Sequence, residues 1–213
     1  MQIDRKKRTG LIAVARIAVC FALVWLIPAS RLTAQVGVMR VEEDWELELT
    51  QPDSQLDAPQ VLLVLSPLGE EHDIHFEVDI NHASLPSYLS GGLQMRAMHG
   101  AECVDQKRLL DGQRLTVESD MIRWTQIVEK QPTGFAFGIT KGTSSSWGAF
   151  GDAASHVTLS GNSGDFNYSP ANSLSRSGVT YAGNRVKQLT LRKVRYVDLT
   201  GTTTEIDVNQ AVQ

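Results

Sequence analysis

The sequence predicts an all-β protein, a two-layer antiparallel β-sandwich of the jelly-roll type. Apolar and polar residues alternate along several segments after residue 40, which is the pattern of strands with one buried face. Turn residues such as Gly, Pro, Asn and Asp separate these segments, and no stretch after residue 35 keeps a helical period. Many short strands joined by turns are typical of sandwiches and barrels, and the one-sided apolar pattern favours the sandwich.

The N-terminus has the three parts of a secretory signal peptide. Residues 5–8 are all basic, residues 17–27 are apolar without interruption, and residues 32–34 offer a small-residue cleavage site. The apolar stretch is shorter than the roughly 20 residues that a membrane-spanning helix needs. We therefore expect residues 1–34 to be removed on export. This leaves a single domain at 35–213, secreted or periplasmic, without a stable membrane anchor; an uncleaved N-terminal anchor is the alternative.

Loss of the leader makes the chain strongly acidic. The 213 residues include 20 Lys and Arg and 24 Asp and Glu, and the leader holds six of the basic residues and one acid. The remaining 179 residues carry 14 basic and 23 acidic side chains, a net charge of −9. Such a surface disfavours nucleic acid and anionic membranes as partners. Cys103 is then the one remaining cysteine, and we expect a buried or merely tolerated thiol.

Two segments show the strand pattern most clearly. The first predicts a half-buried strand with an acidic outer face, because Val41, Trp45, Leu47 and Leu49 alternate with Glu42, Asp44, Glu46 and Glu48. The second places Ile74, Phe76, Val78 and Ile80 on one side and His75, Glu77 and Asp79 on the other. We expect further strands at 61–65, 93–98, 115–118, 122–128, 135–140, 156–160, 188–196 and 205–208.

Glu77 and Asp79 are two carboxylates on the polar face of the strand predicted at 74–80. Paired carboxylates shift each other's pKa, which suits acid–base or nucleophilic chemistry on a glycosidic bond. The segment from Glu77 to Asn81 resembles the catalytic strand of the laminarinase-like β-glucanases, whose sandwich fold is concanavalin A-like. The resemblance implies Glu77 as the nucleophile and Asp79 as a supporting carboxylate. The acid/base position falls on Asn81 or His82, and neither is the Glu of that family. A solvated polar strand face is the interpretation we favour.

The histidines do not predict a metal site. A zinc site needs three or four converging ligands, and its usual spacing is absent from the set His72, His75, His82 and His99. His75 is expected to point to the same side as Glu77 and Asp79, where it is a further candidate for binding a ligand. Calcium is the one cofactor alternative, around Asn162 and Asp165, where the order of an EF-hand loop is missing.

Residues 142–183 are rich in Gly and Ser and form the most loop-like part of the chain. Binding sites are often built from such loops on a rigid scaffold. Trp147, Tyr168 and Tyr181 are candidates for a platform on which a sugar ring stacks, and Arg185 is a candidate for binding a carboxylate or capping a turn. The alternative for Trp147 is a place at the end of the core, because large aromatic residues are mostly buried.

The chain as a whole resembles secreted bacterial β-sandwich proteins to which no activity is assigned. We expect an exported non-enzymatic β-sandwich that binds a ligand such as a glycan, or serves as an envelope or extracellular component. No Gly-x-Ser-x-Gly element and no nucleotide-binding Gly-rich motif is present. The alternatives are a glycan-active enzyme that uses Glu77 and Asp79 and a purely structural or interaction module.

Overall fold

The computed structural model describes residues 37–50, 60–69, 73–81, 92–110, 119–161, 164–181 and 186–212. All of them belong to one compact unit, Leu32–Gln213. The predicted signal peptide at 1–34 and the predicted strand at 115–118 lie outside the described residues. Within the described ranges the chain forms twelve strands and one short helix.

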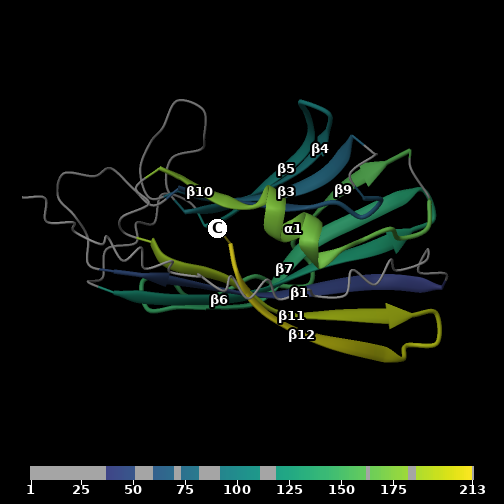
Figure 1. Ribbon diagram of the computed structural model, residues 1–213. Coiled ribbons are helices and arrows are strands. Elements are labelled where there is room, and N and C mark those ends of the chain that lie inside the picture. The colour runs from purple at the N-terminus through teal and green to yellow at the C-terminus, as the bar shows by residue number, and fades with distance from the viewer. Residues whose placement is uncertain are drawn as a thin grey trace, which may run out of the picture. The chain divides into compact units, whose positions relative to one another are not determined.

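The strands form two antiparallel sheets that pack face to face (Figure 1). In sheet A the order is β12-β11-β1-β6-β7-β8, and β9 also pairs with β7. Its strands are β1 (Val38–Leu49), β6 (Asp120–Gln131), β7 (Gly134–Ser144), β8 (Gly148–Phe150), β9 (His156–Ser160), β11 (Val186–Asp198) and β12 (Thr203–Ala211). In sheet B the order is β10-β2-β3-β4-β5. Its strands are β2 (Gln60–Leu65), β3 (Ile74–Asn81), β4 (Leu93–His99), β5 (Glu102–Leu110) and β10 (Gly178–Tyr181). The predicted two-layer antiparallel sandwich is therefore confirmed.

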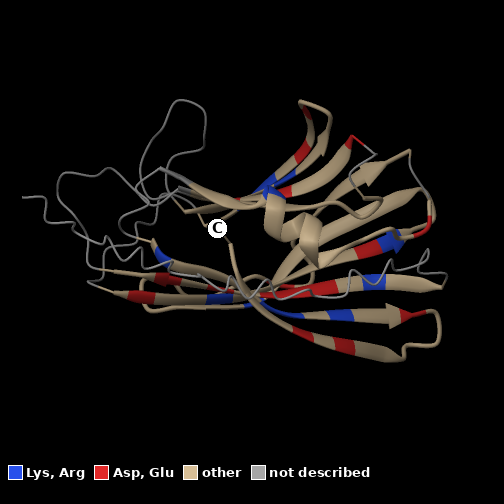
Figure 2. Cartoon of the chain, in the orientation of Figure 1, with Lys and Arg blue, Asp and Glu red and all other residues tan. Residues whose placement is uncertain are grey.

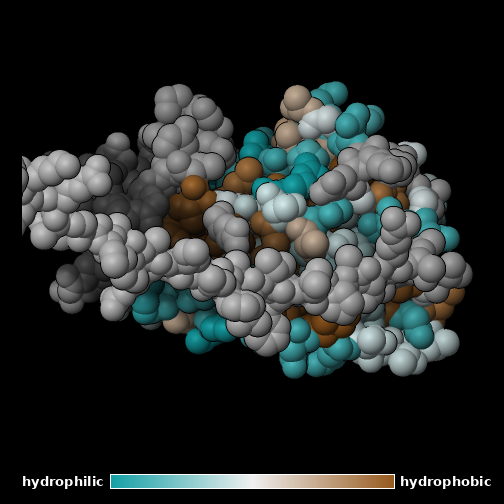
Figure 3. Space-filling model, in the orientation of Figure 1, coloured by the Kyte–Doolittle hydropathy of each residue, from teal (hydrophilic) through white to brown (hydrophobic). Residues whose placement is uncertain are grey.

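The core lies between the two sheets and is built from alternate residues of each strand. Phe76 of β3 stacks on Phe137 of β7 across the sheets, with ring centroids 5.0 Å apart and planes 9° apart. Trp45 and Trp124 are direct neighbours on β1 and β6, and both are buried. Burial of such side chains is the main favourable contribution to folding, at about 25 cal/mol for each Å² of apolar surface. Figure 3 shows hydrophobic residues in the space between the sheets and hydrophilic ones above and below.

Helix α1 (Pro170–Arg176) packs against β2 and β12, so it bridges the two sheets on one side (Figure 1). Proline suits the first turn of a helix because its missing N–H would have no partner there. At the other end of α1, the Arg176 guanidinium donates a hydrogen bond to the hydroxyl of Ser66. The Ser177 hydroxyl accepts a hydrogen bond of 3.0 Å from the backbone N–H of Val64. These contacts fix the helix to the edge of sheet B.

On the opposite side of the sandwich, a side chain of β5 binds β9. The carboxylate of Asp105 on β5 accepts hydrogen bonds from the backbone N–H of Thr158 on β9, at 2.8 Å, and from its hydroxyl, at 3.4 Å. The open edge of β9 thus meets a fixed carboxylate from sheet B instead of another strand.

Glu43 breaks the expected pattern of β1, because it lies on the inner face between Val41 and Trp45 and is fully buried. The Tyr168 hydroxyl donates a hydrogen bond of 2.6 Å to one carboxylate oxygen, and the Trp45 indole N–H donates one of 2.8 Å to the other. Burial raises the pKa of Glu43 above its ordinary value, although the hydrogen bonds of Ser173, Tyr168 and Trp45 act in the opposite direction. A charged Glu43 therefore carries a desolvation cost in the folded protein.

This cost predicts a specific pH dependence. A group whose pKa is raised on folding stabilises the native state fully below its unfolded pKa, and this contribution is lost as the pH rises through the folded pKa. We expect Glu43→Gln to remove that loss, so that the stability of wild type relative to the variant falls as the pH rises from acidic values through the raised pKa of Glu43. Urea unfolding across this range measures the difference, with the exposed Glu102→Gln as a control. If the difference in unfolding free energy between wild type and Glu43→Gln did not change with pH, the pKa of Glu43 would not be raised on folding.

Candidate functional site

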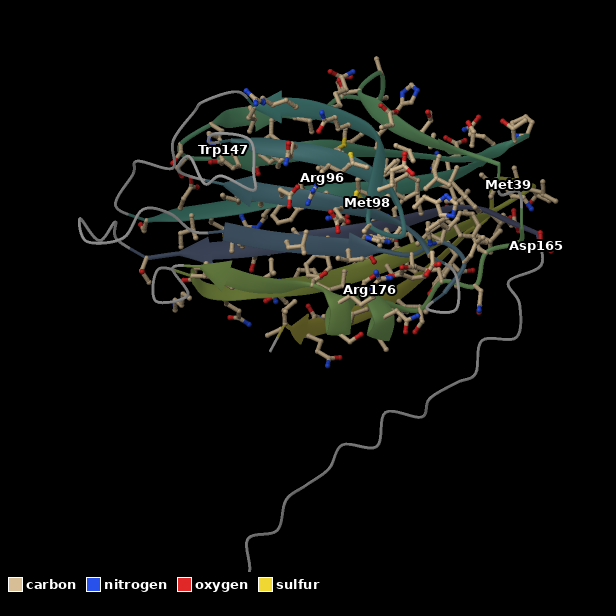
Figure 4. The ribbon with its side chains drawn as sticks, turned by 90° about the horizontal axis from the view of Figure 1, so that it is seen from above. Met39, Arg96, Met98, Trp147, Asp165 and Arg176 are labelled. Carbon is tan, nitrogen blue, oxygen red and sulfur yellow. The ribbon has the colours of Figure 1, made fainter. Side chains whose placement is uncertain are left out.

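The outer face of sheet B brings together the three polar residues that the sequence placed on one side of β3. His75, Glu77 and Asp79 lie there beside two partners from β4, since Glu77 is paired in register with Arg96 and Asp79 with Gln94. Figure 4 looks onto this face, with Arg96 near its middle and Arg176 at the side of α1. The side chains of this cluster other than Arg96 are buried: the exposed fraction is 2% for Asp79, 5% for Gln94, 8% for His75 and 9% for Glu77.

Arg96 contacts both carboxylates. Its Nη2 lies 2.7 Å from Glu77 Oε2, and its Nε lies 2.7 Å from Asp79 Oδ2. Glu77 also contacts His75, with 3.2 Å between Oε1 and Nε2, and the Gln94 side-chain amide donates a hydrogen bond of 2.9 Å to Asp79. The face that we expected to be solvated is instead a largely buried network of ion pairs and hydrogen bonds.

The network shifts the pKa values of the two carboxyl groups in opposite directions. Burial alone would raise the pKa of Glu77, but the hydrogen bond from His75 and the charge of Arg96 outweigh it and hold the pKa below its ordinary value. Burial prevails at Asp79, whose pKa is raised although Arg96 and Gln94 lower it. Glu77 is therefore ionised at neutral pH, and both groups are already bound by neighbouring side chains.

This arrangement bears on the glycosidase alternative. A retaining glycosidase needs a nucleophile and a separate protonated acid that can reach the leaving group. Glu77 and Asp79 are both bound to the same guanidinium of Arg96, and neither is exposed by more than 9%. The cluster is built as a buried ion-pair network, in which Arg96 offsets the charge of two carboxylates.

Trp147 and Tyr168 of the candidate aromatic platform lie in the core, which is the place that the alternative interpretation gave to Trp147. Trp147 is 8% exposed and packs edge to face on Phe150, with ring centroids 5.6 Å apart. Tyr168 is 2% exposed, lies edge to face with Tyr196 at 5.9 Å and donates its hydroxyl hydrogen to Glu43. Both described rings belong to the core and offer no free face for stacking. The side chain of Tyr181 and all of Arg185 lie outside the described residues.

The turn that carries Trp147 is held by Asp120, a residue that the sequence did not single out. Its carboxylate accepts hydrogen bonds from the Ser144 hydroxyl at 2.6 Å and from the backbone N–H groups of Ser145 and Ser146 at 2.8 and 2.9 Å. Burial would raise the pKa of Asp120, but these donors outweigh it and lower the pKa. The Ser-rich turn is thus a rigid connection between β7 and β8.

Two further expectations concern Cys103 and metals. Cys103 is exposed on β5, so the buried alternative is wrong, and partial desolvation raises the pKa of its thiol and disfavours the reactive thiolate. Asn162 lies outside the described residues, and Asp165 forms an ion pair of 2.7 Å with Lys130. In the ranges that the structure describes, no group of three or more His, Cys, Asp or Glu side chains is placed to hold a metal ion. No helix among these residues is long and apolar enough to cross a membrane.

The outer face of sheet A carries the acidic side chains predicted for β1, and arginines from the neighbouring strands pair with them. Asp44 binds both terminal nitrogens of Arg195 at 2.6 Å, and Glu46 lies between Arg123 and Arg192. Figure 2 shows the two signs of charge side by side across this sheet. Such partly exposed pairs contribute little to stability individually, and here they balance the charge of the β1 face.

Beside these pairs, the same face is hollowed into a groove of about 390 Å³ over β6, β7 and β9, and its lining mixes polar side chains with the apolar Ile127, Phe137 and Ala153. Its floor follows the small outward residues Ala136 and Gly138 of β7 and ends at Thr140. Its rim is formed by longer polar side chains of the flanking strands, namely Arg40, Glu129, Gln131, His156 and Thr158. The sequence missed the groove because these positions become neighbours only through strand pairing.

The wall of the groove is the turn 152–155. Asp152 fixes this turn, because its carboxylate accepts hydrogen bonds from the backbone N–H of Ser155 at 2.7 Å and from its hydroxyl at 3.2 Å. The turn approaches β7 so closely that a Cβ on Gly138 would lie 2.9 Å from the carbonyl oxygen of Ser155. Glycine at this position therefore allows the wall to form.

One polar side chain on the floor of the groove lacks a hydrogen-bond partner among the described residues. The Oγ1 of Thr140 is buried and has no hydrogen-bond partner within the described part of the chain. A buried hydroxyl without a partner costs about 1–3 kcal/mol, so such groups are uncommon in native proteins. Trp124 and Gln126 also hold a buried nitrogen without a hydrogen-bond partner in the described ranges, and Thr140 differs from them because it lines the groove.

Comparison with known proteins assigns neither a family nor a function to the chain. No family model matches the chain, and no curated protein matches its sequence.

The ion-pair network of sheet B predicts a strong effect of removing its centre. Arg96→Met leaves two buried carboxylates unpaired and is expected to lower the free energy of unfolding by about 3 kcal/mol. Arg123→Met, which removes an arginine that is 59% exposed in its pair with Glu46, should cost less than about 1 kcal/mol. Adding Glu77→Gln and Asp79→Asn to Arg96→Met should recover most of the loss. Equal effects of the two arginine substitutions in chemical denaturation would refute the network.

The position of Trp147 predicts a second stability effect. Trp147→Ala removes a buried ring from the end of the core and is expected to lower the free energy of unfolding by about 3–5 kcal/mol. Thermal and urea unfolding measure this loss. A variant as stable as wild type would show that the ring contributes no packing and would reopen the stacking alternative.

Proposed function

We propose that the protein is an exported, non-enzymatic β-sandwich that binds a glycan in the groove of sheet A. The leader at 1–34, with its basic, apolar and small-residue parts, supports export. The groove volume of about 390 Å³ falls within the range of small-molecule sites. Its lining combines hydroxyl, amide, imidazole and charged groups, which are the groups that hydrogen-bond the hydroxyls of a sugar.

The unpartnered hydroxyl of Thr140 is the observation that carries this proposal. Thr140 lies on a strand, so its position is fixed by the sheet before any ligand arrives. A site built on rigid elements loses little conformational freedom on binding. Oγ1 is buried in the unbound protein, so a ligand oxygen reaches it when the Thr140 side chain turns toward the groove, and the hydrogen bond then removes the cost of leaving Oγ1 buried alone.

The binding of both sheet B carboxylates by Arg96 supports a non-enzymatic function. The groove itself contains the carboxylates of Glu129 and Asp152. Asp152 is engaged by Ser155, so the groove offers one carboxylate, that of Glu129, without an intramolecular hydrogen bond among the described residues. Binding by hydrogen bonds is the function that this set of groups serves best.

Thr140→Val provides a sharp test because it removes the hydroxyl and keeps the shape. We expect it to weaken glycan binding by about tenfold, the loss of one buried hydrogen bond, while the free energy of unfolding stays unchanged or rises. A glycan array on the mature domain, followed by calorimetry of the best ligand, measures the binding.

Thr125→Val is the matched control, since the Thr125 hydroxyl donates a hydrogen bond of 2.8 Å to Asp44 outside the groove. It should lower stability by about 1 kcal/mol and leave binding unchanged. An array without any bound glycan, or equal binding by wild type and Thr140→Val, would refute the proposed site.

A further inference from the structure

A second hollow adjoins the groove on the other side of β9. It measures about 270 Å³ and lies between β5 and β9, where it is lined by His99, Val104, Asp105, Leu159 and Ser160 together with Thr158. Thr158 also lines the groove, so the two hollows meet at this one exposed residue. The two hollows thus lie on either side of Thr158, and we refer to them together as the track.

The junction of the two hollows is rigid. The hydrogen bonds from Thr158 to Asp105 hold β9 against β5 and fix the crossing point. Val104, at the second hollow, is 47% exposed and is one of three large hydrophobic residues exposed in the described ranges. An exposed aliphatic side chain next to fixed polar groups suits the apolar face of a sugar ring, which carries hydroxyls at its edge.

The charges along the track disfavour an anionic ligand. Acidic side chains line both hollows, with Glu129 and Asp152 in the first and Asp105 in the second. Arg40 is the one lysine or arginine among the lining residues, and its Nε lies 3.0 Å from Glu42. A sulfate or carboxylate group would therefore meet like charges without a free cation to bind it.

We propose that the ligand is an extended, uncharged oligosaccharide that runs from the groove across Thr158 into the second hollow. This inference rests on the proposed function and adds the chemical class and the length of the ligand. A chain that occupies both hollows makes contacts that a single short unit cannot make, so affinity should increase with chain length until both are filled.

Calorimetric titration with cello-, xylo- and manno-oligosaccharides, from disaccharide to hexasaccharide, tests this inference. We expect the hexasaccharide of the bound series to bind about tenfold more tightly than the disaccharide. Val104→Glu should abolish this gain and leave disaccharide affinity unchanged, because it replaces the apolar contact of the second hollow with a hydrated carboxylate and leaves the groove unaltered. Leu199→Glu is the matched control, since Leu199 is exposed, apolar and outside both hollows.

The outcomes separate this inference from the function on which it rests. Affinity independent of length, or a length gain that survives Val104→Glu, would overturn the second subsite and leave glycan binding in the groove standing. Tighter binding of a heparin-derived hexasaccharide would overturn the uncharged class. Failure of every saccharide to bind would remove the proposed function itself, and binding of a peptide in the same track would replace it.

Discussion

The packing of two apolar sheet faces against each other is the constraint on which the rest of the molecule depends. The stacked rings of Phe76 and Phe137 join the two sheets, and Trp45 and Trp124 are buried as neighbours on β1 and β6. Successive side chains of a strand point to opposite faces, so every residue committed to this interface leaves its neighbour on an outer face. The core therefore fixes which residues are available for recognition. Even the buried Glu43 is accommodated because donors from Tyr168 and Trp45 saturate its two oxygens.

The ion pairs on the two outer faces differ in how deeply they are buried. On sheet B, Arg96 is surrounded by two buried carboxylates, and such a buried network fixes a particular arrangement more than it adds stability. On sheet A, the acidic side chains of β1 are paired at the surface with arginines of β6 and β11. Both networks leave their charged groups satisfied within the chain. The groove over β7 differs, because small residues on its floor and the unpartnered Thr140 hydroxyl leave both space and hydrogen-bonding capacity.

The sequence predicted most of the described strands because period-two alternation is a local property of the chain, but it missed β5, β8 and β10. The inward side of β3 and the acidic outer face of β1 followed directly from it. Glu43 was missed because a polar residue at an inward position looks, in sequence, like part of the acidic surface. Helix α1 was missed because seven residues in a Ser-rich segment give no helical periodicity. The partnership of Glu77 with Arg96 and the meeting of β7 with the turn 152–155 depend on register and closure, which no local pattern encodes.

Burial of Trp147 and Tyr168 changes what recognition by this protein would require. Stacking on an exposed aromatic ring provides affinity from one large contact, whereas the track over β9 offers many small polar contacts and one exposed valine. Individual hydrogen bonds exchanged with water contribute only about 0.5–1.5 kcal/mol each. Useful affinity on such a surface requires several simultaneous contacts. The ligand and the site must also lose little conformational entropy when these contacts form. Rigid walls, a floor set by strand pairing and a crossing point fixed by Asp105 meet that requirement better than a mobile loop would.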